Sequence, residues 1–230
     1  MTHDIFPGEF FERLAPTRQV PHPGAFATAP MPEGLDATIA QFTAAIEAVG
    51  GRVSRAGSTG EAADVVLGYL EAPDWRAHDQ QGPGAFVAWD GAHLALPDVP
   101  AYVEARGARR LDAVVGTTQV DRDEDYRRLD AAVVGITGAH AALADTGSLA
   151  LVHGEGRGRL VSLLPPVHVA IVEVARLHAT LGALFAAEPD LLRQAANVVV
   201  VTGPSRTADI EMTLTRGVHG PRVVHVVFVG

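Results

Sequence analysis

Cysteine is absent from the 230-residue sequence. Its absence excludes disulfides, thiolate nucleophiles, and zinc or iron–sulfur sites with cysteine ligands. Lysine is absent as well, because all 18 basic residues are arginine. This excludes Schiff-base catalysis and a phosphate-binding lysine of the Walker type. Any contact with an anion must therefore come from arginine, histidine, hydroxyl groups or backbone N–H groups.

Long apolar runs are also missing. No stretch of about 18 uncharged apolar residues occurs, so the sequence predicts no membrane-spanning helix. The N-terminus carries acidic residues early and lacks a continuous apolar core, which argues against a secretory signal and predicts a cytoplasmic location. The formal net charge of −9 argues against a nucleic-acid partner. An apolar fraction of 47% is instead typical of an ordinary globular protein.

Proline content and helical periodicity divide the chain. Residues 1–30 hold five prolines, and we expect them to form an N-terminal arm. Residues 31–230 are expected to form one domain. An apolar stripe at helical spacing runs from Leu35 to Val49 and ends at Gly50, which predicts a helix. Ser58 and Glu61 have the spacing of a capping box and predict the start of a second helix.

Apolar runs rich in valine predict the strands. They cover residues 52–55, 85–89, 93–96, 111–118, 131–136, 148–152, 167–172, 198–201 and 223–229. Further helices are expected at residues 139–144, 174–185 and 191–195. Because helices and apolar strands alternate, the sequence predicts an α/β fold, a single three-layer α/β/α domain with a largely parallel sheet and an antiparallel hairpin.

A glycine-rich segment, GEGRGR at residues 154–159, superficially resembles a dinucleotide-binding loop. That fingerprint requires a helix directly after the glycines. The residues that follow here, LVSLL and two prolines, are typical of a strand that stops. We therefore expect a hairpin turn, across which His153 and His168 can meet. No histidines occur at the spacing of a metal motif, so no metal is assigned.

The segment from residue 197 onward concentrates residues that bind anions. A valine-rich strand is followed by the turn TGPSR and, from Thr207, by an expected short helix. This order presents backbone N–H groups to a ligand. Gly203 permits the turn, Ser205 and Thr207 offer hydroxyl groups, and the guanidinium of Arg206 can bind a carboxylate or phosphate. The alternative is structural, with the polar side chains capping the helix and Arg206 on the surface.

Two further turns supply candidate site residues. The turn at residues 145–148 is expected beside the glycine turn at the strand ends, although an ordinary type I turn explains it equally. His219 and Glu211 are candidate catalytic residues that move a proton, and the alternative for His219 is a rigid turn in which it caps a carbonyl. The predicted ligand-binding residues are Asp145, Thr146, Gly147, Ser148, Gly203, Ser205, Arg206, Thr207, Asp209, Gly220 and Arg222.

Two motifs, ITGAHAALADTGSLAL and TGPSRTADIEMTLTRGVHGPRVVHVVFV, resemble those of the LUD domain family, the group that includes lactate utilisation protein C. The resemblance covers roughly the C-terminal two thirds of the chain, judged by the order of the motifs. It implies a fold similar to the NagB/RpiA/CoA-transferase group. It also implies a role in bacterial L-lactate oxidation to pyruvate. One departure is mild, because Ser148 stands where the family turn often has threonine.

Because the chain lacks cysteine, the resemblance implies a non-redox subunit or accessory protein with no cofactor of its own. Iron–sulfur clusters are then expected only in partner subunits. The expected ligand is a small carboxylate or phosphate, and a homodimer is left open. Two other functions are left open as well. One is a stand-alone enzyme acting on a sugar phosphate, folate or CoA ester, and the other is a purely structural subunit.

Overall fold

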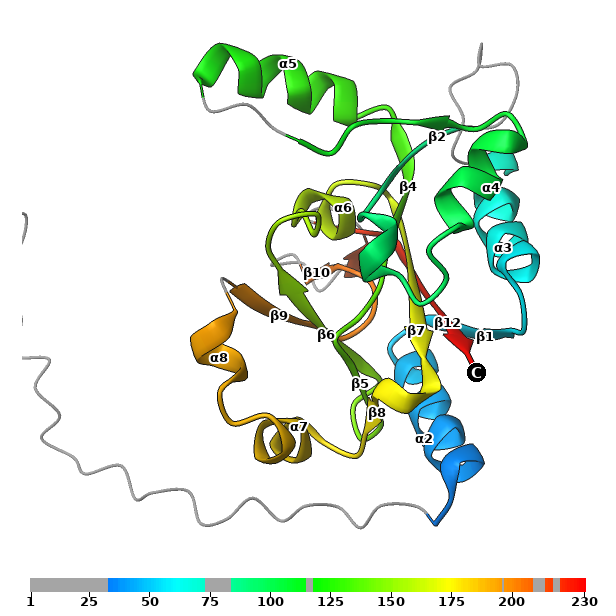
Figure 1. Ribbon diagram of the computed structural model, residues 1–230, viewed down its shortest axis with the longest axis vertical. Coiled ribbons are helices and arrows are strands. Elements are labelled where there is room, and N and C mark those ends of the chain that lie inside the picture. The colour runs from blue at the N-terminus through cyan, green and yellow to red at the C-terminus, as the bar shows by residue number, and fades with distance from the viewer. Residues whose placement is uncertain (1–32, 73–83, 115–117, 196, 209–213, 217–219) are drawn as a thin grey trace, which may run out of the picture.

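The computed structural model describes residues 33–72, 84–114, 118–195, 197–208, 214–216 and 220–230 (Figure 1). The arm expected at residues 1–30 lies outside the described residues. Within them, no helix combines the length and the apolar character that crossing a membrane would require.

A parallel sheet forms the centre of the described chain. Its six strands lie in the order β1-β12-β7-β4-β2-β3, and each neighbouring pair is parallel. In chain order the strands are β1 (Arg52–Ala56), β2 (Ala85–Ala88), β3 (Arg109–Arg110), β4 (Ala132–Thr137), β7 (Val167–Glu173) and β12 (Val223–Val229). The predicted α/β fold with a largely parallel sheet is therefore confirmed.

Helices cover this sheet, since its central strands are apolar along almost their whole length and need partners on both faces. Helix α2 (Leu35–Ala48) places the ring of Phe42 edge-on against that of Phe228, with centroids 5.1 Å apart. Helix α3 (Thr59–Glu71) begins at Ser58, whose hydroxyl accepts a hydrogen bond from the Glu61 N–H, as the capping box predicts. Helices α4 (Val99–Ala105) and α6 (Leu160–Leu163) pack on α3 and β4, respectively.

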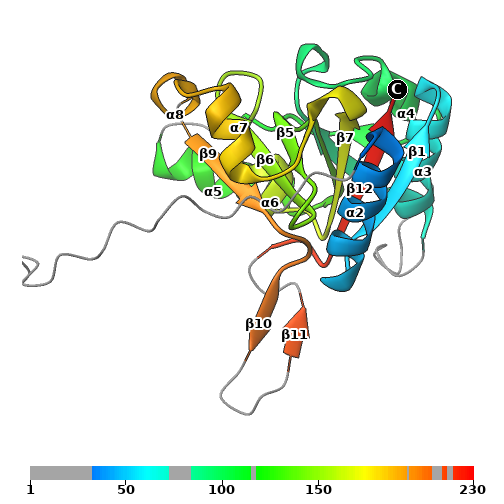
Figure 2. The same cartoon turned by 90° about the horizontal axis from the view of Figure 1, so that it is seen from below.

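A second sheet of four strands in the described chain lies beside the first, in the order β8-β5-β6-β9 (Figure 2). Its strands are β5 (Ala141–Leu143), β6 (Ser148–His153), β8 (Leu177–His178) and β9 (Asn197–Val201). Helices α7 (Leu181–Ala187) and α8 (Leu191–Gln194) follow β8, and their Leu184 and Leu191 pack with Leu143 and Val152 in a small separate core. The helix predicted at residues 139–144 is therefore wrong. Alanine favours helices, but here burial between two strands overrides that preference.

Other local predictions fail where short elements replace the expected ones. The strand expected at residues 93–96 is absent, and a 3₁₀ helix η2 (Gly91–His93) precedes that segment. Of the strand expected at residues 111–118, the described residues 111–114 form no strand, and β3 ends at Arg110, directly before them. The residues after the glycine-rich turn form α6 instead of a strand. The single helix expected at residues 174–185 is divided into η3 (Val174–Arg176), β8 and α7, because Thr180 caps α7 and restarts the helix there.

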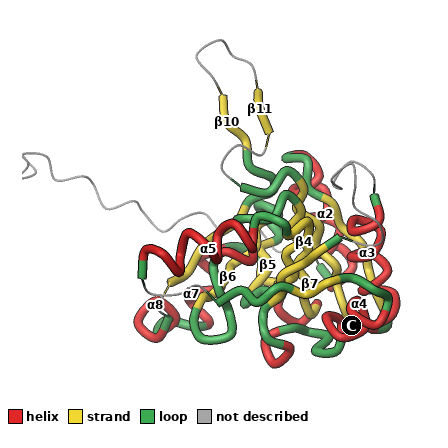
Figure 3. Tube along the Cα trace, turned by 90° about the horizontal axis from the view of Figure 1, so that it is seen from above, coloured by secondary structure: helices red, strands yellow, loops and turns green. Residues whose placement is uncertain are grey.

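A two-stranded hairpin, β10 (Arg206–Ala208) and β11 (Leu214–Arg216), projects from the body of the molecule (Figures 2 and 3). Its strands are antiparallel, with Arg206 opposite Arg216. The short helix expected from Thr207 is therefore wrong, because residues 206–208 pair as a strand with residues 214–216. The charged helix α5 (Gln119–Leu129), capped by Thr118, precedes β4 and lies at the top of the view in Figure 1.

Candidate functional site

The order of the strands identifies where this sheet can hold a ligand. Strands β2 and β4 are neighbours, yet the connection after β2 leads to β3 on one side and the connection after β4 leads to β7 on the other. The loops that leave their carboxyl ends therefore diverge. Open α/β sheets bind ligands in the crevice outside such diverging strand ends.

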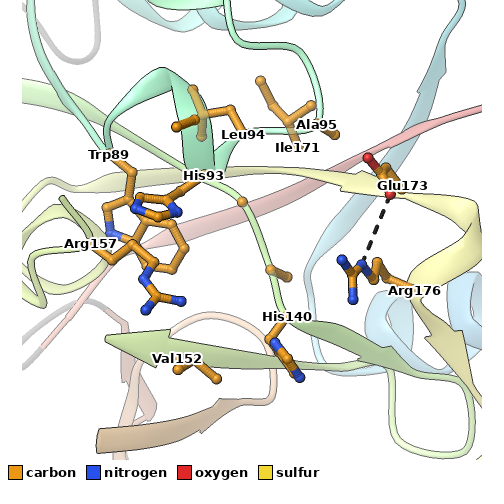
Figure 4. A pocket seen from close by; sticks show the side chains of 13 residues that line it. Trp89, His93, Leu94, Ala95, His140, Val152, Arg157, Ile171, Glu173 and Arg176 are labelled. Carbon is orange, nitrogen blue, oxygen red and sulfur yellow. Dashed lines mark ion pairs between the residues drawn. The ribbon is translucent and has the colours of Figure 1, made fainter. Parts of the chain in front are cut away.

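A pocket of about 200 Å³ lies at this point (Figure 4). The loop after β2 supplies Trp89 and His93, and the loop after β4 supplies Gly138 and His140. The remaining walls come from the end of β7, from the 3₁₀ helix after it, and from the second sheet with its glycine-rich turn. The main side chains that they contribute are Ile171, Glu173, Arg176, Val152 and Arg157. The pocket thus lies between the two sheets and opens to solvent.

The glycine-rich turn at residues 154–158 forms one wall and is fixed to the loop after β2. Gly154 and Arg157 exchange backbone hydrogen bonds of 3.4 and 3.0 Å. A turn therefore lies at the predicted place, but the expected hairpin is wrong, because helix α6 and not a strand follows it. The carbonyl of Gly158 accepts a hydrogen bond of 3.0 Å from Trp89 Nε1. Gly156 has φ of +68°, and an added Cβ would lie 2.5 Å from the Asp90 carboxylate. Glycine is therefore required there, and the contacts hold Arg157 at the pocket.

The charges around the pocket leave one arginine without a counterion. Arg176 and Glu173 form an ion pair of 3.9 Å (Figure 4). His140 Nε2 lies 2.8 Å from Glu188 Oε2. By contrast, the side chain of Arg157 makes no hydrogen bond or ion pair with any residue that the structure describes, and its Nε is buried. The guanidinium of Arg157 is therefore available to an anion that enters the pocket.

Two buried histidines lie behind this wall. His168 is fully buried, its Nε2 lies 2.7 Å from Thr137 Oγ1, and burial lowers its pKa to about 4. His153 is 5% exposed, and its ring meets Trp89 edge-on at a centroid distance of 5.9 Å. Burial also lowers the pKa of His153, while the smaller opposing effect of Asn197 comes from a contact that falls short of hydrogen-bond geometry. Both rings are therefore neutral at pH 7.

The residues predicted from the sequence lie elsewhere, near the end of α2. Ser148 Oγ lies 2.8 Å from Thr146 Oγ1 and also 2.8 Å from Thr202 Oγ1, so the turn at residues 145–148 does meet the glycine turn after β9. Gly147 has φ of +62° and packs on Ile46, and Gly203 has φ of +77° and packs on Val49. The two segments come together as expected, but their hydroxyl groups mainly bond to each other.

The rest of the predicted site is joined by backbone contacts. The N–H of Ser205 donates to the Pro221 carbonyl at 2.8 Å, which brings Gly220 and Arg222 near the glycine turn. The guanidinium of Arg206 donates a hydrogen bond to the carbonyl of Val49 at the end of α2. Asp209, Glu211, His219 and the side chain of Thr207 lie outside the described residues. Ligand binding by the residues predicted from the sequence, and catalysis by His219 and Glu211, stay predictions.

Sequence reasoning missed the pocket between the sheets. His93, His140, Glu173 and Arg176 lie on segments that were assigned to other elements, and strand order cannot be read from local periodicity. One signal was available. The GEGRGR segment combines two arginines with three glycines, a composition that suits close approach of a ligand even where the dinucleotide-binding pattern fails.

Comparisons with known proteins find related sequences. A protein called lactate utilization protein C from Macrococcus caseolyticus is 35% identical over 147 residues, 62% of this chain and 60% of that protein. Its namesake from Halalkalibacterium halodurans is 39% identical over 141 residues, 59% of this chain and 58% of that protein. The matched part thus spans less than two thirds of these relatives.

A solved structure shares the fold. The crystal structure of a DUF162 family protein from Deinococcus radiodurans superposes with a TM-score of 0.60 at 20% identity, over 86% of this chain and all of that one. The model of the LUD domain matches residues 39–229, which include both sheets and the pocket. The chain therefore belongs to the LUD domain family.

Proposed function

We propose that this chain serves bacterial L-lactate utilisation as a subunit that binds a small carboxylate in the pocket at the carboxyl ends of β2, β4 and β7. The names of its relatives supply the pathway. The observation that carries the binding role is the unpaired guanidinium of Arg157 at the pocket wall.

The chemistry of the pocket suits a short carboxylic acid. A guanidinium binds a carboxylate through two parallel N–H groups, and this contact is stronger where water is partly excluded. A volume of about 200 Å³ is below that of most drug-sized sites. It accommodates a three-carbon acid such as lactate or pyruvate and not a whole coenzyme. His93 and His140 add hydrogen-bonding groups at the rim.

Oxidation of lactate also requires an electron acceptor. The chain has no cysteine to ligate an iron–sulfur cluster, so we place the redox centres in iron–sulfur partner subunits and assign no cofactor to this chain. In this proposal the subunit holds or delivers the carboxylate while electrons pass to the partners.

Genetic complementation tests the proposal. Deleting the gene in its native host should abolish growth on L-lactate as the sole carbon source, and a wild-type copy should restore growth. An Arg157→Gln copy should fail to do so. An Arg159→Gln copy should succeed, because Arg159 lies on the same turn but does not line the pocket. Normal growth of the deletion strain, with no paralogue present, would contradict the proposed role.

The size of a second pocket, but not its charge, suits a different candidate, a stand-alone enzyme with a larger substrate such as a sugar phosphate, folate or CoA ester. This pocket, of about 680 Å³, lies on the other side of the glycine-rich turn. Its charged lining is mostly acidic, with Asp90, Glu104, Asp112 and Glu155 against Arg110. Phosphates would meet repulsion there. Stabilisation in a thermal-shift assay by CoA or sugar phosphates, but not by lactate or pyruvate, would favour this candidate.

A further inference from the structure

Strand β9 lies at the end of the four-stranded sheet, and its outer edge pairs with no strand that the structure describes. On its inner side, all five residues of β9 pair with residues 149–153 of β6. β6 is buried along its whole length, whereas every residue of β9 is at least partly exposed. The backbone N–H and C=O groups on the outer edge are therefore accessible to a further strand.

The other three edges of the two large sheets are protected from such pairing. Proteins protect edge strands by keeping them short or by placing charged residues on them. β3 and β8 are each two residues long, and β3 consists of two arginines. β1 carries Arg52 and Arg55, both of which are exposed. β9 has neither form of protection, because four of its five residues are valine and its pairing with β6 contains no bulge.

Apolar side chains beside the free edge extend it into a surface patch. Val200 is 42% exposed, and Leu192 on the adjacent helix α8 is 61% exposed (Figure 1). Val198 packs against the small core that includes Leu184 and Leu191, and this contact holds the strand in place. A preformed strand edge of this kind binds another strand through main-chain hydrogen bonds, and apolar side chains add to the affinity.

We propose that β9 pairs with β9 of a second copy of this chain, which joins two four-stranded sheets into one sheet of eight strands across a twofold axis. A twofold interface uses the same patch on both copies. In an antiparallel pair centred on Val199, Asn197 of each copy lies opposite Val201 of the other. Because β9 carries no charge, no like charges meet, and valine lies against valine, a residue type that suits neighbouring strands. The strand is thus complementary to itself, which identifies the second copy as its partner.

Sedimentation velocity of the full chain tests the proposal. The wild-type protein should sediment as a dimer of the 24.1 kDa chain. Val200→Lys should weaken the dimer at least about tenfold, because it places a charge of the same sign on both strands of the apolar edge. The matched control is Val120→Lys, at a 68% exposed position on α5, which is well separated from β9 in Figure 1. This variant should dimerise as the wild-type protein does.

Two results of the sedimentation experiment would overturn the proposal. One is a wild-type protein that stays monomeric at every concentration, and the other is a Val200→Lys dimer as strong as that of the wild-type protein. Circular dichroism shows whether Val200→Lys is folded, so that a lost dimer is not mistaken for a lost fold.

Hydrogen exchange of the wild-type protein provides a measurement that depends on no variant. Backbone amides of β9 should exchange more slowly in the dimer than after dilution to the monomer, whereas amides of the central strand β4 should exchange equally slowly in both. Equal exchange of β9 in the two states would show that a different surface joins the copies. A monomer in which all amides of β9 are protected would show that another segment of the same chain covers the edge. Either result would contradict pairing between two copies of β9.

Discussion

Thr137 Oγ1 and His168 Nε2 lie 2.7 Å apart inside the parallel sheet, on two strands that are fully buried at this point. Burial lowers the pKa of His168 from an ordinary 6.5 to about 4, and the proximity of His153 adds a smaller effect in the same direction. The folded protein thus keeps this ring neutral in a pH range where the unfolded chain protonates it.

Stability should therefore fall as the pH drops from 6.5 toward 4, because the unfolded state binds the additional proton. For His168 alone we expect the free energy of unfolding to decrease by about 2 kcal/mol between pH 7 and pH 5. Burial, and to a smaller extent Arg52, lowers the pKa of His225 to about 4. His225 therefore acts in the same direction. Urea denaturation at both pH values measures the change. His168→Gln should reduce it and His93→Gln, at an exposed position, should not. A wild-type protein equally stable at both values would contradict the account.

Gly147→Ala should destabilise the fold by about 2 kcal/mol or more. Gly147 has φ of +62°, and a Cβ there would lie 2.3 Å from the backbone nitrogen of Ile46 in α2. The matched control is Gly68→Ala within α3, where a Cβ meets nothing within 4 Å. That change should stabilise the protein by about 0.5–1 kcal/mol, because alanine favours helices over glycine. Thermal unfolding of both variants provides the measurement, and a harmless Gly147→Ala would refute the packing described for the turn.

Arg206→Ala separates the two candidate sites. The Arg206 guanidinium is exposed and bonds to the Val49 carbonyl at the end of α2. Its removal should lower stability by about 1 kcal/mol or less and leave the affinity for L-lactate unchanged. If Arg206→Ala instead binds L-lactate more weakly and Arg157→Gln binds it as the wild-type protein does, the ligand binds at the segment predicted from the sequence, near Ser205 and Arg222.

Trp89→Phe should loosen the wall that carries Arg157. The substitution removes the hydrogen bond from Trp89 Nε1 to the Gly158 carbonyl and part of a buried ring. We expect a loss of about 1–3 kcal/mol in stability and weaker binding of L-lactate. Tyr126→Phe on α5, where the side chain is 44% exposed, is the control and should change neither quantity. Wild-type affinity in Trp89→Phe would show that this anchor does not position Arg157.

The central strands of the parallel sheet were predictable because they are buried on both faces. A strand in that position must be apolar throughout, and runs such as residues 167–172 and 223–229 are recognisable for that reason. The capping box at Ser58 was predictable because its contacts are local in sequence. Residues 139–144 and 206–208 were misassigned, since pairing with other strands decided their structure against local propensity.

The candidate site was predictable only in part. The contact between the two polar turns, made by Ser148 and Thr202, follows from neighbouring strand ends and was expected. The pocket at Arg157 depends on the order of β2 and β4 in the sheet and on the anchoring of the glycine-rich turn by Trp89. Both are tertiary relationships between segments far apart in the chain, and no periodicity encodes them.

The most direct test of the carboxylate pocket is a calorimetric titration of the purified chain with L-lactate. The wild-type protein and Arg159→Gln should bind with equal affinity, and Arg157→Gln should bind at least about tenfold more weakly, because it loses a charged hydrogen-bonding contact. Equal affinity of Arg157→Gln and the wild-type protein would contradict the central claim that Arg157 holds the ligand.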